Sequence, residues 1–291
     1  MQRLPRVKGY MRTAVAMNRL FLKAGASPTF QTDMKLGHRL IVDARGPQSV
    51  AAFTGKYDDS QIRCLQALLP VGGVILDVGA NIGYYTFPLA LMAKQKNARV
   101  VAFEPFPKNC ERLRANIDLN GLASYVDLQP FALSSEAGTA MLALREDFSE
   151  GGEVGNASIV HDKQIDGEFK QVPITLVRLD DIWPTLGLNR LDLIKADIEG
   201  LEDLFLQGAR QTLERFRPII QMEINRSFYE SRGVDIEVAV PAALPSGHRF
   251  FRMNGAERFV PISDLSVFRD VANPFDEAFA APEEKSQLLP Q

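Results

Sequence analysis

The stretch Val74-Ile75-Leu76-Asp77-Val78-Gly79-Ala80-Asn81-Ile82-Gly83, followed by Val100-Val101-Ala102-Phe103-Glu104-Pro105, decides the fold. An apolar run ends in a glycine-containing loop, a helix-like segment follows, and a second apolar run ends in a carboxylate. This order is typical of a β-loop-α-β unit, whose glycines let backbone N–H groups approach an adenosine-containing cofactor. The carboxylate that closes the second strand, Glu104, is placed to accept both hydroxyls of a ribose.

The spacing of the glycines favours one cofactor over another. A dinucleotide-binding loop reads G-x-G-x-x-G and serves a pyrophosphate. Here the middle glycine is absent, and Asp77 stands just before the turn. An acid at that place repels a pyrophosphate and suits a cationic or amino-bearing ligand, so the loop favours S-adenosylmethionine over NAD. Two alternatives stay open at this point: an NAD-dependent oxidoreductase, and a glycine turn that serves only tight packing of strand and helix.

Composition narrows the class of protein. The chain has 291 residues, 46% of them hydrophobic and 24% charged, which is ordinary for a globular protein with a full core. Its formal net charge of −3 gives no basic field, so a nucleic-acid partner is not expected. Cys64 and Cys110 lie on apolar helical faces, which indicates reduced core thiols and a cytoplasmic protein. Neither the h-region of a secretory signal nor a membrane-length apolar run is visible.

Charge and polarity divide the chain into segments. Residues 1–34 form a basic arm, in which six basic residues and no acid occur up to position 32. This arm is expected to contact a membrane surface, to pack on the domain as a helix, or to remain solvated. A strand-helix extension (35–70) and the main domain (71–270) follow, and polar residues 145–171 are expected to form a lid-like insertion. The tail (271–291) is expected to be frayed or docked.

Strand and helix patterns alternate through the main domain, which predicts a parallel sheet covered on both faces. After the strand that begins at Val74, strands are expected at 99–103, 126–133, 138–144, 172–177, 192–197 and 218–224, with a closing hairpin at 249–253 and 258–262. Helices are expected at 84–94, 107–120, 201–216 and 235–244. Ahead of the domain, short strands at 35–43 and 49–57 precede a helix that begins at Asp59-Ser60 and ends at Pro70.

Several further motifs occur in the order of a known family. They are Leu76–Tyr84, Phe103-Glu104-Pro105 with Asn109 and Asn116, Pro130–Ser134, Asn156-Ala157-Ser158, Val177–Asp181 and, most diagnostic, Leu193-Ile194-Lys195-Ala196-Asp197-Ile198-Glu199-Gly200. With them the chain resembles the FkbM family of class I S-adenosylmethionine-dependent methyltransferases. The resemblance implies an α/β, Rossmann-like, doubly wound sheet of seven mostly parallel strands, one of them antiparallel.

The resemblance also implies a set of cofactor-binding residues. Asp77 and Gly79 would neighbour the methionine moiety, Glu104 would hold the ribose, and Phe131-Ala132 would meet the adenine. The rest of the implied cofactor-binding set comprises Ala80, Asn81, Gly83 and Pro105. One departure is Tyr57-Asp58, where the family often has Tyr-Glu, which puts in doubt a role for that pair in closing over the cofactor.

Acids at the end of the fourth strand are the candidates for catalysis. A hydroxyl acceptor must lose its proton, which a nearby carboxylate assists. Asp197 and Glu199 lie where that strand ends, and Lys195 shares a face with Asp197. Lys195 is therefore a catalytic candidate or merely orients the acid. His161 in the insertion is a second candidate base. Asp197, Glu223 and Asn225 together would suit Mg²⁺, a site that we do not favour.

The expected function is O-methylation. The resemblance implies transfer from S-adenosylmethionine to a hydroxyl of a saccharide or secondary metabolite. The alternatives are an RNA or protein methyltransferase, for which the basic arm is the only support, and a scaffold that has lost turnover. The sequence identifies neither the acceptor nor the oligomeric state.

Overall fold

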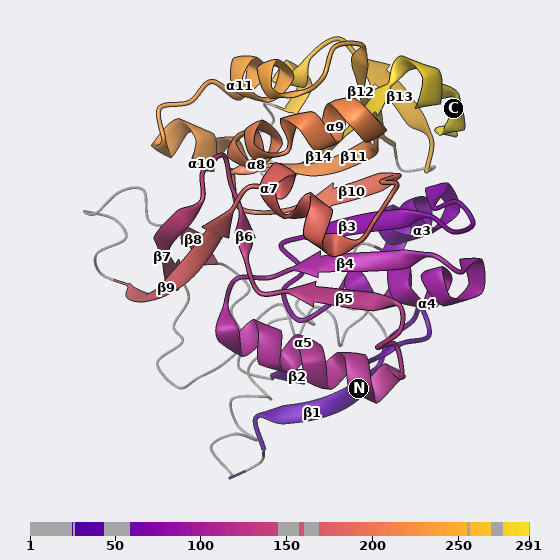
Figure 1. Cartoon of the computed structure of the whole chain (residues 1–291), viewed down its shortest axis with the longest axis vertical. Coiled ribbons are helices and arrows are strands. Elements are labelled where there is room, and N and C mark those ends of the chain that lie inside the picture. Colours follow the sequence, from indigo (N-terminus) through magenta and orange to yellow (C-terminus); the bar gives the residue numbers. More distant parts are fainter. Residues whose placement is uncertain are drawn as a thin grey trace, which may run out of the picture.

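The predicted β-loop-α-β unit forms the middle of a large sheet in the computed structural model, which describes residues 25, 27–43, 59–144, 157–159, 169–254, 257–268 and 276–290 (Figure 1). Eight strands of the described residues build this sheet. In spatial order they are β13 (Phe259–Ile262), β12 (His248–Met253), β14 (Asp276–Pro282), β11 (Ile219–Ile224), β10 (Leu193–Ala196), β3 (Val74–Val78), β4 (Arg99–Phe103) and β5 (Val126–Gln129).

Strands β5, β4, β3, β10 and β11 run parallel, as predicted. Strand β14 is antiparallel to both of its neighbours, β11 and β12, and β13 is antiparallel to β12. The α/β, Rossmann-like, mostly parallel sheet is therefore confirmed, with eight strands rather than seven and two of them reversed. Because the carboxyl ends of the parallel strands share one edge, Asp77, Glu104, Asp197 and Glu223 are brought toward that edge.

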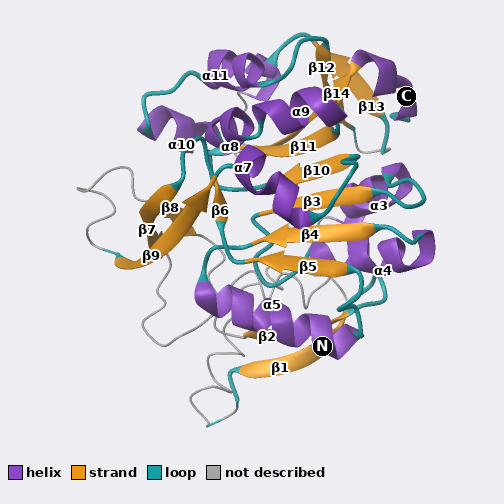
Figure 2. Ribbon diagram, in the orientation of Figure 1, coloured by secondary structure: helices purple, strands orange, loops and turns teal. Residues whose placement is uncertain are grey.

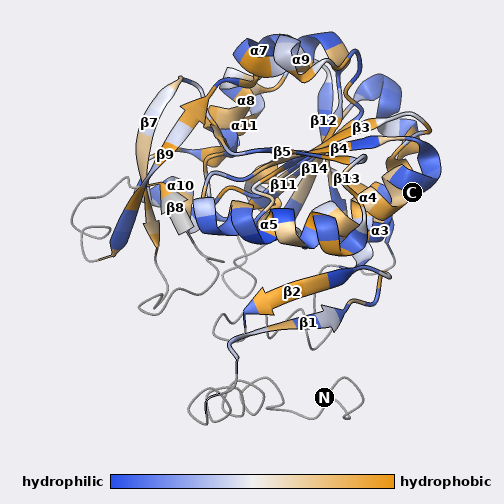
Figure 3. Ribbon diagram, turned by 60° about the horizontal axis from the view of Figure 1, so that its bottom comes forward, coloured by the Kyte–Doolittle hydropathy of each residue, from blue (hydrophilic) through white to orange (hydrophobic). Residues whose placement is uncertain are grey.

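Helices cover both faces of the sheet (Figure 2). Their bounds are α3 (Asp59–Leu68), α4 (Thr86–Lys96), α5 (Pro107–Asn120), α7 (Leu179–Ile182), η1 (Trp183–Leu186), α8 (Glu202–Gly208), α9 (Arg210–Phe216), α10 (Arg226–Ser231), α11 (Ile236–Ala243), η2 (Leu265–Phe268) and η3 (Glu283–Leu288). Helices α3 to α5 pack on one face, and helices α7 to α11 pack on the other (Figure 3). The predicted helices are confirmed, except that the expected helix 201–216 is interrupted at Ala209.

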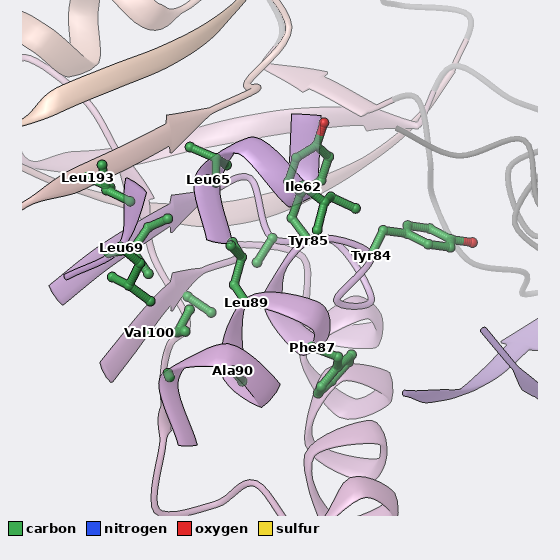
Figure 4. Packing of buried hydrophobic residues seen from close by; sticks show 14 of the residues in the cluster. Ile62, Leu65, Leu69, Tyr84, Tyr85, Phe87, Leu89, Ala90, Val100 and Leu193 are labelled. Atoms are coloured by element: carbon green, nitrogen blue, oxygen red, sulfur yellow. The ribbon is translucent and has the colours of Figure 1, made fainter. Parts of the chain in front are cut away.

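Alternating side chains of each strand build the two cores. In β3, Ile75 belongs to the cluster with α3 to α5, whereas Leu76 belongs to the cluster with α7 to α11. Both side chains are fully buried. Figure 4 shows Leu65 of α3 and Leu69, which follows α3, in the same cluster as Leu193 of β10. Both faces of β3 are buried, which explains the hydrophobic run that precedes Asp77.

The N-terminal hairpin is connected to the main domain by Asn116 and Asn120 of α5. Strands β1 (Thr29–Asp33) and β2 (Arg39–Asp43) pair antiparallel. Asn116 accepts the amide of Ile41 (2.7 Å) and donates to the carbonyl of Ile82 in the loop after β3 (3.1 Å). Asn116 therefore connects the hairpin to the glycine loop.

A second, four-stranded sheet stands apart from the first (Figure 3). Its order is β6 (Ala132–Leu133), β9 (Lys170–Val177), β7 (Gly138–Leu144) and β8 (Ala157–Ile159). The predicted strand 126–133 is therefore divided between two sheets. Leu142, Leu144 and Ile174 pack with Phe106 into a small core of their own.

The C-terminal segment was expected to be frayed or docked. In the structure β14 lies inside the large sheet, between β11 and β12, so this segment supplies a central strand. Its apolar residues Ala278 to Ala281 are buried. They follow one another without a polar residue, which is the pattern of a strand covered on both faces. The run is short and stands in a proline-containing, acidic context, so the sequence does not predict a strand there.

Several predicted features lie outside the described residues. They are most of the basic arm, the strand 49–57, the pair Tyr57-Asp58 and the greater part of the insertion, including His161. Residues 255 and 256, between the two strands of the closing hairpin, also lie outside the described residues. Within the part of the chain that the structure describes, no helix combines the length and the hydropathy needed to cross a bilayer.

Candidate active site

Asp77 at the end of β3 is fully buried. Its Oδ2 accepts the hydroxyl of Thr86 at 2.6 Å, and its Oδ1 lies 3.5 Å from Nζ of Lys195. The sequence suggested that the charge of Asp77 would face a cationic ligand. In the structure this charge is instead opposed by a lysine of the same chain, because β10 is the neighbour of β3 and Lys195 pairs with Asp77 in register.

The glycines of the loop serve close packing within the chain. Gly79 has φ +80°, and a Cβ atom there would lie 2.0 Å from the carbonyl oxygen of Asp197. A Cβ at Gly83 would lie 2.0 Å from the ring of Phe87. The amides of Gly79 and Ala80 both donate to the carbonyl of Phe103 at 3.0 Å. These glycines therefore make close contacts within the chain, and the approach of loop amides to a cofactor stays a prediction.

Glu104 at the end of β4 is held by backbone amides. Its Oε2 accepts the amide of Asn81 at 2.8 Å, and its Oε1 accepts the amide of Phe106 at 2.9 Å and the side chain of Asn109 at 3.4 Å. Burial raises the pKa of Glu104 to about 7, although these hydrogen bonds and Lys195 act in the opposite direction. A carboxylate offers about four acceptor positions, so room remains for further donors.

The turn expected to meet an adenine lies beside Glu104. The carbonyl of Gln129 accepts both the amide of Glu104 (3.1 Å) and the amide of Phe131 (2.9 Å). Phe131 and Ala132 are half-buried, as is Pro105. Asn81 adopts φ 54°, and its Oδ1 accepts the amide of Ile82 at 2.8 Å. The structure thus brings the predicted cofactor-binding residues to one edge of the sheet.

Lys195 is a buried cation between two acids. Its Nζ lies 3.5 Å from Asp77 and 3.5 Å from Asp197, and it donates to the carbonyl of Gly79 at 3.3 Å. The ring of Tyr85 covers it, with Nζ 4.9 Å from the ring centroid. Burial alone would lower the pKa of Lys195, but the adjacent acids outweigh burial and raise it, so the ammonium is retained. Lys195 therefore orients Asp197 and is not placed to act as a base.

Two carboxyl groups meet at the ends of β10 and β11. Glu223 is hydrogen-bonded to Asp197, and the pKa of Glu223 is raised to about 11 by burial and by the charges of Asp197, Glu199 and Glu202. Burial and these neighbouring charges therefore disfavour the ionised form of Glu223, and its contact with Asp197 acts in the same direction. The side chain of Asp197 is 40% exposed, which leaves it the more accessible of the two acids.

The oxygen-rich set Asp197, Glu223 and Asn225 lies at neighbouring strand ends. Asn225 is buried and accepts the hydroxyl of Ser227 at 2.7 Å. Among the described residues no group of three or more His, Cys, Asp or Glu side chains is arranged to hold a metal ion. The two described histidines lie in other surroundings: His38 is buried near Phe87, and His248 contacts the carbonyl of Pro245.

Comparison with known proteins identifies the family. The model of the methyltransferase FkbM domain matches residues 77–253, more than half of the chain. The chain belongs to the FkbM methyltransferase family. The predicted resemblance is thereby confirmed. The matched segment includes Asp77, Glu104, Lys195, Asp197 and Glu223, but ends before β14.

Three curated relatives illustrate the similarity. Methyltransferase sdnD of Sordaria araneosa is 33% identical over 49% of this chain and 62% of its own length. The 2-O-methyltransferase NoeI of Sinorhizobium fredii is 30% identical over 55% of this chain and 66% of its own length. The 31-O-demethyl-FK506 methyltransferase FkbM of Streptomyces tacrolimicus is 27% identical, with coverages of 62% and 73%. The chain therefore spans about three fifths of the length of sdnD and two thirds of that of NoeI.

Sequence reasoning missed several residues of this FkbM-family site. Glu277 of β14 accepts the hydroxyl of Tyr85 at 3.3 Å and the side-chain amide of Gln221 at 2.6 Å. Tyr229 donates to Glu202 at 2.8 Å. These contacts join segments far apart in the chain, and no local spacing indicates them. Only Thr86 could have been found from the sequence, because it is the first residue of the helix that follows the glycine loop.

Proposed function

We propose that this protein transfers a methyl group from S-adenosylmethionine to a hydroxyl of a saccharide or secondary metabolite. The observation that carries the proposal is the carboxylate of Glu104, buried at the end of β4 and fixed by two backbone amides. A ribose offers hydroxyl donors, and a carboxylate that keeps a free acceptor position beside its three bound donors is a suitable partner for one of them. Family membership and the names of two relatives, a 2-O-methyltransferase and a 31-O-demethyl-FK506 methyltransferase, support O-methylation.

The residues around Glu104 fit this cofactor. Phe131 and Ala132 lie at the turn next to Glu104, where they would contact an adenine placed beyond the ribose. Asn81 and Gly83 shape the loop that holds the amide directed at Glu104. Asp77 would act indirectly, because its charge is engaged by Lys195 and Thr86. When bound, S-adenosylmethionine supplies an electrophilic methyl group on a sulfonium.

The acids at β10 and β11 would serve the acceptor. Asp197 is exposed enough to receive the hydroxyl proton, and Lys195 holds it in place. Glu223, hydrogen-bonded to Asp197, would keep that carboxylate oriented. Glu199 follows in a left-handed conformation that directs the chain away from the strand. Positioning of the two reactants supplies much of the acceleration in such a displacement.

Calorimetry with S-adenosylmethionine and with NAD⁺ tests the cofactor. Micromolar binding of S-adenosylmethionine alone is the expected result, and binding of NAD⁺ alone would overturn the proposal. The acceptor class is tested by release of S-adenosylhomocysteine with a panel of methyl hexosides and macrocyclic alcohols. Turnover of an RNA transcript or a protein instead of these alcohols would replace the proposed acceptor. Cofactor binding without turnover of any of these substrates would favour a scaffold that has lost catalysis.

A further inference from the structure

The loop between β10 and α8 has an unusual backbone. Two consecutive residues, Glu199 at φ 58° and Gly200 at φ 80°, adopt the left-handed conformation. A glutamate rarely does so, and such a conformation persists only where the surroundings hold it. A Cβ atom at Gly200 would lie 2.3 Å from Cβ of Phe228, so helix α10 packs directly on this loop.

A buried hydrogen-bonded pair connects the loop to α10. Oε1 of Glu202 accepts the amide of Ile198 at 3.1 Å, and Oε2 accepts the hydroxyl of Tyr229 at 2.8 Å. Glu202 is fully buried and Tyr229 is 1% exposed. Burial raises the pKa of Glu202 to about 7, while the bonds from Tyr229 and Ile198 favour its ionised form. Glu202 thus reaches back from the first turn of α8 to fix the residue that follows Asp197.

A second buried connection follows α10. Arg232 donates to the carbonyl of Gly200 and makes two hydrogen bonds of 2.8 Å to Asp203. The side chains of Arg232 and Asp203 are 8% and 4% exposed. The contacts of Phe228, Tyr229 and Arg232 therefore all fall on a short segment, residues 198–203.

We propose that Glu202 and Tyr229 are positioning residues for methyl transfer, which hold the loop so that Asp197 and Glu199 stay at the carboxyl edge of the sheet. This inference rests on the proposed function. The pair touches neither the glycine loop nor Glu104, and it acts through the backbone of Ile198, the residue next to Asp197. Its loss should therefore lower turnover and leave cofactor binding unchanged.

The test compares Tyr229→Phe with Tyr125→Phe. The first variant removes the hydroxyl that binds Glu202 and keeps the ring, and the second removes a hydroxyl from the turn before β5, at the opposite edge of the sheet. In Tyr229→Phe we expect amide hydrogen exchange in residues 198–204 to rise about tenfold, because a bond to a buried carboxylate is lost. Exchange in β3 should stay unchanged. Affinity for S-adenosylmethionine should stay within about twofold, and kcat for the alcohol that the wild-type protein methylates should fall about tenfold.

Glu202→Gln provides an independent variant, since the amide keeps the shape of the side chain but supplies only one acceptor oxygen. It should reproduce the same split between kcat and cofactor affinity. Unchanged exchange in 198–204 would overturn the proposal, as would increased exchange with unchanged kcat. A wild-type protein that binds no S-adenosylmethionine would refute the proposed function instead, while the exchange comparison would still decide whether Glu202 and Tyr229 hold the loop.

Discussion

At the end of β4 the carboxylate of Glu104 is bound mainly by backbone amides, whereas at the ends of β10 and β11 the acids are bound by other side chains. The amides of Asn81 and Phe106 belong to the loop and turn beside Glu104. Asp197 depends instead on Lys195 and Glu223. The first region is therefore built by the local backbone, and the second by charges that must balance one another. Substitutions should affect the two regions in different ways.

Removal of Lys195 should have the largest effect, since this residue connects the two regions. In Lys195→Met the buried Asp77 loses its opposing charge, as does Asp197. Breaking a buried ion pair costs about 3–5 kcal/mol, so the free energy of unfolding should fall by that amount. Urea denaturation followed by circular dichroism measures it. The exposed Lys94 at the end of α4 gives the matched control, Lys94→Met, and a loss below about 1 kcal/mol in Lys195→Met would contradict the buried pairing.

Gly79, in the loop beside Glu104, packs directly against the backbone of Asp197. In Gly79→Ala the new Cβ would lie 2.0 Å from the carbonyl oxygen of Asp197, at a φ of +80°. Left-handed strain and overpacking together should cost about 2–4 kcal/mol. Gly121→Ala provides a control with φ +61° and open space around the Cβ. Equal losses of stability in the two variants would show that backbone conformation alone, without the contact to Asp197, requires glycine.

The two regions also differ in how far the sequence predicts them. Strand β3, the loop to Gly83 and the carboxylate after β4 follow one another in a pattern that local propensity determines, and the structure confirms each of them. The contact of Lys195 with Asp197 could be expected from their alternation along one strand. The contact with Asp77 could not, because it depends on which strands become neighbours. Glu277 escaped prediction for the same reason, since its strand enters the sheet from the C-terminal segment.

Glu104→Gln should weaken cofactor binding. The amide keeps the volume of the side chain but replaces one acceptor by a donor, which conflicts with a ribose hydroxyl and with the backbone amides already present. A hydrogen bond to a charged group contributes about 1.5–3 kcal/mol, so the dissociation constant for S-adenosylmethionine should rise roughly 100-fold. Calorimetry measures this change, with Glu136→Gln on the surface as control. Unchanged affinity would remove Glu104 from the proposed site.

The smallest predicted effect is the pH dependence of cofactor affinity, which should come from Glu104 and not from the acids at β10 and β11. Because burial raises the pKa of Glu104 to about 7, ionisation of this group disfavours the folded protein as pH rises from about 4.5 to about 7. Ribose hydroxyls bind the ionised form, so cofactor affinity should increase with pH through this range, and binding should in turn lower the pKa.

Between pH 6 and pH 8 the affinity of wild type should rise about tenfold, the ratio of the ionised fractions. Calorimetry at both pH values should show no such rise in Glu104→Gln. Persistence of the rise in that variant would show that a group other than Glu104 titrates when the cofactor binds.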